Sequence, residues 1–207
     1  IPRELCSIQS MVGLEIFLNP LISGTIPPEI GNLTNLQELS LHYDTMISGT
    51  IPVELAKLTN LSQLNLFDMH KISGTIPPEL CKLPNLVAIN IFDNPLISGT
   101  FPQDLEQLKK LEALTIINSP RLSGIVPTRI GSLSNVNAVN IFGNPLLSGT
   151  IPQEICQMAS LANVYFNSIP LLSGTIPPQL SNLSKLYWLN LFGDPQISGT
   201  IPPELGN

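Results

Sequence analysis

Residues 76–100 read IPPELCKLPNLVAINIFDNPLISGT, and this 25-residue pattern decides the fold because it is written eight times without a gap. A Ser-Gly pair marks the same point of every copy, from Ser23 and Gly24 to Ser198 and Gly199. A fixed period in this range is typical of a stacked solenoid, in which each unit buries its apolar face only against its neighbours. We therefore expect residues 1–207 to form a single domain, with a partial ninth unit at the end.

The second half of the unit has the spacing of a β-strand. Ile89 and Ile91 lie two residues apart, which places both on one side of a strand and puts Asn90 and Phe92 on the other side. When the copies stack, these strands form a parallel sheet with one side facing the core.

The first half of the unit has a different spacing. The apolar residues of the segment 76–83 lie three and four apart, and prolines followed by Glu79 favour the first turn of a short helix or 3₁₀ helix. Before this turn, the Ser-Gly-Thr segment suits a short second strand, with glycine supplying a backbone conformation that other residues resist.

The composition excludes several classes of function. Lys and Arg number 9 against 15 Asp and Glu, for a net charge of −6, whereas nucleic-acid binding needs a basic stripe. No apolar run approaches the roughly 18–20 residues of a membrane span. His42 and His70 occupy different unit positions, and no catalytic, phosphate-binding or metal-ligand spacing occurs. We expect no enzyme activity, no cofactor and no metal site.

The cysteines repeat at one unit position. Cys6, Cys81 and Cys156 lie three units apart, which is about 14 Å at one strand spacing per unit. A disulfide requires Cα atoms within about 7 Å, so we expect three unpaired, half-buried thiols.

The repeated unit resembles the plant-type leucine-rich repeat. The segment 186–191, Leu-Tyr-Trp-Leu-Asn-Leu, and the following Ile-Ser-Gly-Thr-Ile-Pro-Pro-Glu-Leu are similar to the pattern L-x-x-L-x-L-x-x-N-x-L-S-G-x-I-P. The resemblance covers the whole chain. It implies an α/β, right-handed solenoid with a concave parallel β-sheet, a second short sheet and convex 3₁₀ or helical turns. It also implies a secreted or cell-surface, extracellular module, similar to receptor ectodomains, that binds a protein, peptide or glycan.

The chain departs from this family pattern in two ways. Its unit is one residue longer than the usual 24, and the asparagine that satisfies backbone groups at the turn in the family is often replaced. The residues at this position, number 19 of the unit, are Asn19, Asp44, Met69, Asn94, Ser119, Asn144, Ile169 and Asp194.

Outward side chains of the concave sheet are the first candidates for ligand binding. One column is rich in phenylalanine, and contiguous apolar patches tend to mark binding sites; the alternative is that these rings belong to the core. The last two full units add an aromatic group that includes the only tryptophan, and such groups are frequent hot spots; the alternative is a surface cluster without a role. The candidates are Phe67, Phe92, Phe142, Tyr165, Tyr187, Trp188, Asn190 and Phe192. A weaker candidate for a basic peptide or a cation is the acidic set Asp44, Asp68 and Asp93.

A threonine repeats two residues after the serine, where the family pattern leaves the residue free. Residues two apart on a strand share a face, so serine and threonine would form parallel hydroxyl rows. Such rows resemble those of ice-binding solenoids and could also support lateral packing into fibres; the plainer alternative is recent duplication of one unit. The threonines are Thr25, Thr50, Thr75, Thr100, Thr150, Thr175 and Thr200.

Two further expectations concern the surface and the ends of the array. The sequons at Asn32, Asn60 and Asn182 permit N-glycosylation of a secreted chain. The chain carries none of the cysteine-bearing caps that the family usually has, so the alternative to ligand recognition is a structural solenoid that self-associates through its uncapped ends.

Overall fold

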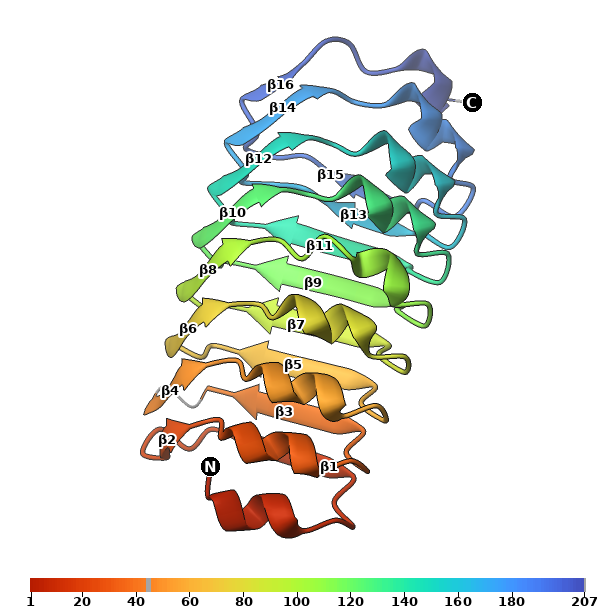
Figure 1. Ribbon diagram of the computed structural model, residues 1–207. Coiled ribbons are helices and arrows are strands. Elements are labelled where there is room, and N and C mark those ends of the chain that lie inside the picture. The colour runs from red at the N-terminus through yellow and green to blue at the C-terminus, as the bar shows by residue number, and fades with distance from the viewer. Residues whose placement is uncertain (44–45, 207) are drawn as a thin grey trace.

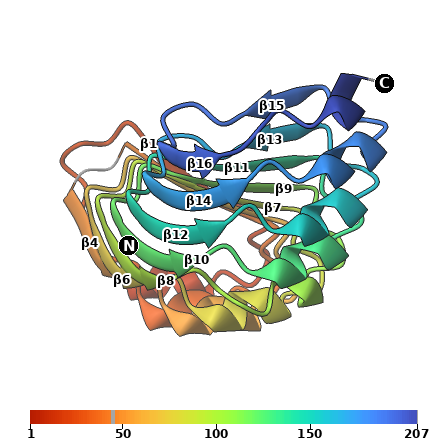
Figure 2. The ribbon, with the colours of Figure 1, turned by 90° about the horizontal axis from the view of Figure 1, so that it is seen from above.

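The chain folds into a solenoid of stacked coils with two parallel sheets (Figure 1). The computed structural model describes residues 1–43 and 46–206. Each unit contributes a strand to each sheet and a 3₁₀ turn on the side opposite the first sheet. Seen from above, the coils rotate progressively from the N-terminus to the C-terminus (Figure 2). The predicted leucine-rich repeat architecture is confirmed.

The first sheet, here called the concave sheet, pairs equivalent strands of successive units in the order β1-β3-β5-β7-β9-β11-β13-β15. Leu39 lies opposite Leu64, and Leu41 opposite Leu66, so that like positions meet directly. Its strands are β1 (Gly13–Phe17), β3 (Glu38–His42), β5 (Gln63–Phe67), β7 (Ala88–Phe92), β9 (Ala113–Ile117), β11 (Ala138–Phe142), β13 (Asn163–Tyr165) and β15 (Trp188–Asn190).

The second sheet, here called the flank sheet, has a different register. Thr50 lies opposite Ser73 of the next unit rather than opposite Thr75. Like positions of neighbouring strands are therefore offset by two residues, and the rows of the flank sheet run obliquely. Its strands are β2 (Ser23–Thr25), β4 (Met46–Thr50), β6 (Lys71–Thr75), β8 (Leu96–Thr100), β10 (Arg121–Ile125), β12 (Leu146–Thr150), β14 (Leu171–Thr175) and β16 (Gln196–Ser198).

The convex turns are 3₁₀ helices, one of the two forms that the sequence predicts. In the fourth unit the turn follows Pro77, carries Glu79 in its first turn and ends as Leu83 N–H bonds to the carbonyl of Leu80. The turns are η1 (Arg3–Ser7), η2 (Pro28–Asn32), η3 (Val53–Lys57), η4 (Pro78–Lys82), η5 (Leu105–Gln107), η6 (Thr128–Ser132), η7 (Gln153–Gln157), η8 (Pro178–Asn182) and η9 (Pro203–Gly206).

One continuous core lies between the sheets and the turns. The inward strand positions Ile89 and Ile91 are buried, as their two-residue spacing predicts. Cys6, Cys81 and Cys156 are buried and unpaired, in agreement with their spacing in the sequence. Burial raises the pKa of the Cys81 thiol to about 11, which keeps this thiol protonated at neutral pH.

From the third unit to the eighth, the asparagine position at the turn is used in alternate units. Asn144 Oδ1 accepts the N–H of Ser119 in the preceding unit (2.9 Å), and its Nδ2 donates to the carbonyls of Ile116 (2.9 Å) and Phe142 (3.0 Å). Asn94 makes the same three bonds one pair of units earlier. We call this arrangement the asparagine bridge.

The units between the bridges hold other side chains at this position. Met69, Ser119 and Ile169 are fully buried there and supply only their backbone N–H. Asp44 lies outside the described residues. Over these six units, the bond to the preceding unit therefore recurs every second unit. The irregular list of residues at this position did not predict this alternation.

The asparagine bridge gives a first prediction. Asn144→Ala should lower the free energy of unfolding by about 3 kcal/mol, because it leaves one buried N–H and two carbonyls without this partner. Chemical denaturation measures the loss.

Ser119→Ala is the matched control at the same position of the neighbouring unit. Its Oγ is buried without a hydrogen-bond partner in the part of the chain that is described, so its removal should change stability by less than about 1 kcal/mol. Equal losses for the two variants would contradict the bridge.

Candidate ligand-binding surface

A column of polar side chains on the outer face of the concave sheet is hydrogen-bonded within the chain over its N-terminal half. Asn90 Nδ2 donates to Asn65 Oδ1 (2.8 Å), Asn65 Nδ2 donates to Ser40 Oγ (2.8 Å), and Ser40 Oγ donates to Glu38 Oε1 (2.9 Å). Ser40 and Asn65 are buried beneath their neighbours. This column therefore stiffens the sheet and leaves few free polar groups for a ligand.

The phenylalanine column lies beside these residues and is half-buried. Phe67 packs against His42 at 4.5 Å between ring centroids and against Phe92 at 6.3 Å in an edge-on arrangement. Phe142 is half-buried and Ile117 buried. From Phe67 to Phe142 the side chains thus form an apolar strip that is only partly accessible, whereas Phe192 of the same column is exposed. The strip is therefore neither fully part of the core nor fully part of the surface.

The aromatic group predicted from the last two full units does come together. Tyr165 on β13 and Trp188 on β15 stack at 6.4 Å between centroids with ring planes 17° apart, and Tyr187 lies 6.4 Å from Trp188. Tyr187 is 83% exposed, Trp188 48% and Phe192 77%. Asn190 Oδ1 accepts the N–H of Phe192 (3.1 Å) and so helps to hold the segment after β15. We call Tyr165, Tyr187, Trp188 and Phe192 the aromatic group.

A groove runs along the corner where the concave strands end. Its volume is about 550 Å³, and carboxylates, an amide and prolines line it. Asp68 lies 3.1 Å from His70, and Asp93 accepts a bond from Asn118 Nδ2 (2.7 Å). The two described members of the weaker acidic candidate therefore already have partners within the chain.

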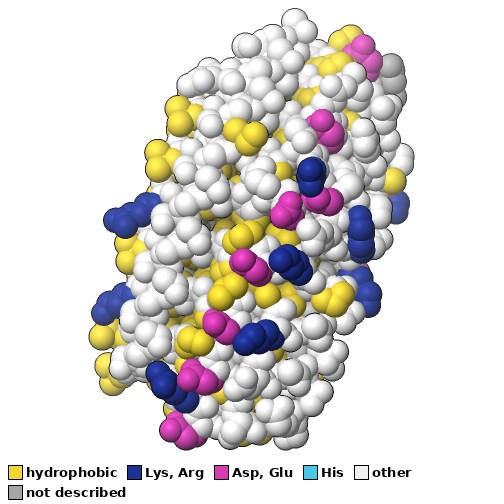
Figure 3. Space-filling model, viewed as in Figure 1, with side chains coloured by type: hydrophobic (Ala, Val, Ile, Leu, Met, Phe, Trp, Pro, Cys, Tyr) yellow, Lys and Arg dark blue, Asp and Glu magenta, His cyan; other side chains and the backbone are white. Residues whose placement is uncertain are grey.

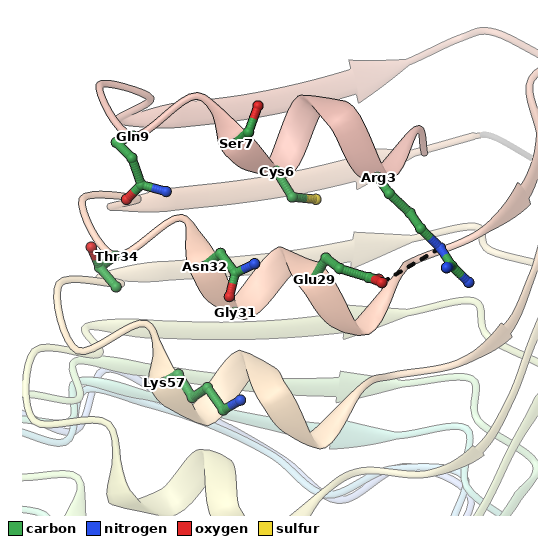
Figure 4. Close-up of a pocket in the computed structure, with 9 residues that line it drawn as sticks. All are labelled: Arg3, Cys6, Ser7, Gln9, Glu29, Gly31, Asn32, Thr34 and Lys57. Carbon is green, nitrogen blue, oxygen red and sulfur yellow. Dashed lines mark ion pairs between the residues drawn. The ribbon is translucent and has the colours of Figure 1, made fainter.

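A second hollow, of about 520 Å³, lies on the convex side between η1, η2 and η3 (Figure 4). Arg3 pairs with Glu29 across it (3.5 Å), and Cys6 and Gly31 lie against its floor. Figure 3 shows acidic and basic side chains side by side along the convex turns. Residue patterns in the sequence did not single out this hollow, because its lining comes from turns of three different units.

On the flank sheet the serine and threonine hydroxyls behave differently. From the second unit on, each serine Oγ donates to the glycine carbonyl of the preceding unit, as Ser173 does to Gly149 (2.9 Å) and Ser123 to Gly99 (2.9 Å). The serine hydroxyls of the predicted rows are therefore bonded within the solenoid. All seven threonines of the predicted row are exposed, while Ile125 interrupts the row.

The threonine side chains are held by the glycines of the next unit. Thr175 Cγ2 lies 3.2 Å from where a Cβ of Gly199 would stand, and Gly199 has a φ of +86°, which side chains resist. The methyl group therefore lies over the next glycine, where a side chain would crowd it. The hydroxyls of these threonines make no hydrogen bond within the described residues and are left to water.

The three sequons lie on accessible backbone. Asn32 on η2 and Asn182 on η8 are exposed. Asn60 is exposed as well, and its Nδ2 donates to the carbonyl of Thr34 (2.9 Å). Glycosylation of these sites remains a prediction.

The solved structures most useful for comparison are plant proteins. The chain is similar to the ectodomain of the Arabidopsis thaliana receptor kinase HAESA in complex with an N-terminally extended IDA peptide hormone. The identity is 30% and the TM-score 0.86, over 100% of this chain and 33% of that one. It is also similar to the A. thaliana GASSHO1/SCHENGEN3 ectodomain in complex with CASPARIAN STRIP INTEGRITY FACTOR 2. The identity is 30% and the TM-score 0.84, over 98% of this chain and 23% of that one. A third similar structure is that of a plant ice-binding protein, with 25% identity and a TM-score of 0.71, over 98% of this chain and 70% of that one.

These similarities define a solenoid of the leucine-rich repeat class. The chain belongs to the plant-type leucine-rich repeat proteins, and it spans about a third or less of the two receptor ectodomains. No protein-family model matches the chain, and neither does any curated protein.

No helix within residues 1–43 and 46–206 combines the length and apolar character needed to cross a lipid bilayer. The same residues hold no group of three metal-ligating side chains.

The flank sheet gives a second prediction. Ser173→Ala should lower the free energy of unfolding by about 1 kcal/mol, because it removes the hydroxyl that bonds to Gly149. Thr175→Val, which keeps the methyl contact and removes a hydroxyl bonded only to water, should change stability by less than about 0.5 kcal/mol. Urea unfolding of both variants checks the contrast, and an equal loss would contradict the separate roles.

Proposed function

We propose that the chain is an extracellular, non-catalytic recognition module that binds an extended peptide along the concave sheet. The observation that carries this proposal is the exposed aromatic group, with Tyr165 and Trp188 stacked on neighbouring strands. The similar HAESA ectodomain, which is in complex with a peptide hormone, supports it. Aromatic side chains offer large contact area at low entropic cost, which makes them frequent hot spots.

The sheet also sets the length of ligand that it can accommodate. Successive units present equivalent side chains about 4.8 Å apart, whereas an extended peptide advances about 3.3 Å per residue. About three residues of a peptide that runs across the strands thus cover the width of two units, and about ten residues cover the width of seven units. The net charge of −6 favours a neutral or basic peptide over an acidic one.

A binding experiment tests this proposal. Dodecapeptides are selected from a random display library on the wild-type protein, and their affinities are measured by calorimetry. Replacing Tyr187 and Trp188 together by alanine should weaken binding about 30-fold or more, as expected for hot-spot aromatics.

Leu146→Ala with Leu171→Ala is the matched control. Leu146 has the same exposed fraction as Trp188, 48%, but lies on the flank sheet. This control should leave affinity unchanged within about twofold. Failure to select any peptide, or equal losses in the two double variants, would reject binding at the concave sheet.

Ice binding by the flank sheet is a second candidate function. Two observations favour it: the threonine hydroxyls have no partner within the described residues, and the chain is similar to a plant ice-binding protein. A rigid row of such hydroxyls can order water, because the contact with the next glycine fixes the threonine side chain.

Thermal hysteresis tests this second candidate. Thr75→Lys with Thr100→Lys should abolish the effect by disrupting the flat row, and Ile125→Thr should increase it by joining the row on either side. Trp188→Ala on the concave sheet should have no effect. A wild-type protein without thermal hysteresis would dismiss ice binding and leave peptide binding untouched.

A further inference from the structure

The eighth unit replaces the asparagine of the bridge by an aspartate. Asp194 is buried, and its Oδ1 accepts the N–H of Ile169 (2.7 Å) in the preceding unit. This is the bond that Asn144 Oδ1 makes with Ser119 one pair of units earlier. Because the backbone partner is equivalent, the aspartate side chain is oriented like the asparagine.

The second side-chain oxygen of Asp194 replaces an asparagine Nδ2, so that a hydrogen-bond acceptor stands where the asparagine bridge has a donor. In the asparagine bridge, Nδ2 of Asn144 donates to the carbonyls of Ile116 and Phe142. By their positions in the repeat, Phe166 and Phe192 are the counterparts of Ile116 and Phe142. Asp194 Oδ2 is buried and has no hydrogen-bond partner among the described residues. An ionised carboxylate cannot donate to a carbonyl, whereas a protonated carboxyl can donate to one.

The surroundings of Asp194 contain no charge that holds it ionised. Burial raises the pKa of Asp194 from 3.8 to about 6, and only the N–H of Ile169 opposes this rise. The remaining ionisable side chains of the two units and of the turn that follows lie on the convex turns, on the concave sheet or just before β15. They are Glu154, Cys156, Tyr165, Lys185, Tyr187 and Glu204.

We propose that Asp194 is a pH-dependent bridge that controls the C-terminal end of the concave binding surface. When protonated, it links the seventh and eighth units as Asn94 and Asn144 link theirs; when ionised, it withholds the donor. Asp194 follows Phe192 by two residues and belongs to the unit that carries Trp188. Control of ligand binding rests on the function proposed above, whereas control of the unit itself does not.

The direction of the effect follows from the raised pKa. The protonated form is favoured in the folded chain, so the stabilisation is fully present below about pH 3.8 and is lost as the pH rises through about 6. The eighth unit should therefore be tighter in mildly acidic solution than at neutral pH.

Fluorescence of Trp188 tests the bridge directly, because it is the only tryptophan of the chain and is half-exposed. Its quenching by acrylamide should increase between pH 4 and pH 8 with a midpoint near pH 6. In Asp194→Asn the quenching should stay low at every pH. At pH 7.5 this variant should melt at least about 2–4 °C higher than the wild type, and at pH 4 the difference should vanish.

Asn144→Asp is the matched variant, which introduces a pH-dependent bridge in the sixth unit. It should lower the melting temperature at pH 7.5 and not at pH 4, because it creates the same buried carboxyl between the fifth and sixth units. The same pH dependence of Trp188 quenching in Asp194→Asn and the wild type would overturn the proposal, and so would an equal effect of Asn144→Asp at both pH values.

A final measurement separates this inference from the proposed function. The affinity of a selected peptide is compared at pH 5 and pH 7.5 for the wild type and Asp194→Asn. We expect weaker binding at pH 7.5 in the wild type alone. A pH-dependent quenching without any peptide binding would reject the concave site and retain the bridge, and pH-independent quenching would reject the bridge whether or not peptides bind.

Discussion

Parallel pairing between equivalent strands of successive coils is the interaction on which every other feature depends. No unit has a core of its own, and the inward residues of one coil, such as Leu64, are buried only because coils lie above and below them. The direct register of the concave sheet, with Leu39 opposite Leu64, also aligns the outward side chains. The columns of phenylalanine and asparagine exist because of this register.

The two sheets share their units but not their register, and this difference shapes both candidate surfaces. On the concave sheet like residues meet directly, so Asn65 and Asn90 form a hydrogen-bonded column. On the flank sheet Thr50 meets Ser73, so serine bonds to the preceding unit while threonine stays free. The same repeat therefore produces one surface with columns of amide and aromatic side chains and another with exposed hydroxyls.

Much of the fold could be predicted from the sequence, and the reason is its period. The spacing of Ile89 and Ile91 fixed the inward face, and the proline-acidic segment fixed the convex turn. The meeting of Tyr165 with Trp188 followed from the stacking of units alone. That these residues bind a ligand is a proposal, since exposure and geometry by themselves do not name an occupant.

Other features could not be predicted because they depend on the direction of individual side chains and on the register between neighbouring coils. The sequence does not tell whether Ser173 Oγ faces water or the carbonyl of Gly149, and a residue column does not reveal the two-residue offset of the flank sheet. The alternating bridge was hidden for a related reason. Its partners are backbone groups of Ile116 and Phe142, which carry no mark in the sequence.

The alternation of the bridge also limits how such an array can be shortened or lengthened by recombination. Loss of residues 101–125 would bring the Asn94 and Asn144 coils into contact and leave an acceptor for the N–H of Met69 and of Ile169, as before. Loss of residues 126–150 would instead remove Asn144 and leave the N–H of Ser119 facing Ile169, an apolar side chain. Whole repeats are thus not equivalent modules, and the genetic exchanges that such a gene tolerates are those that keep an asparagine- or aspartate-bearing repeat after each repeat that lacks one.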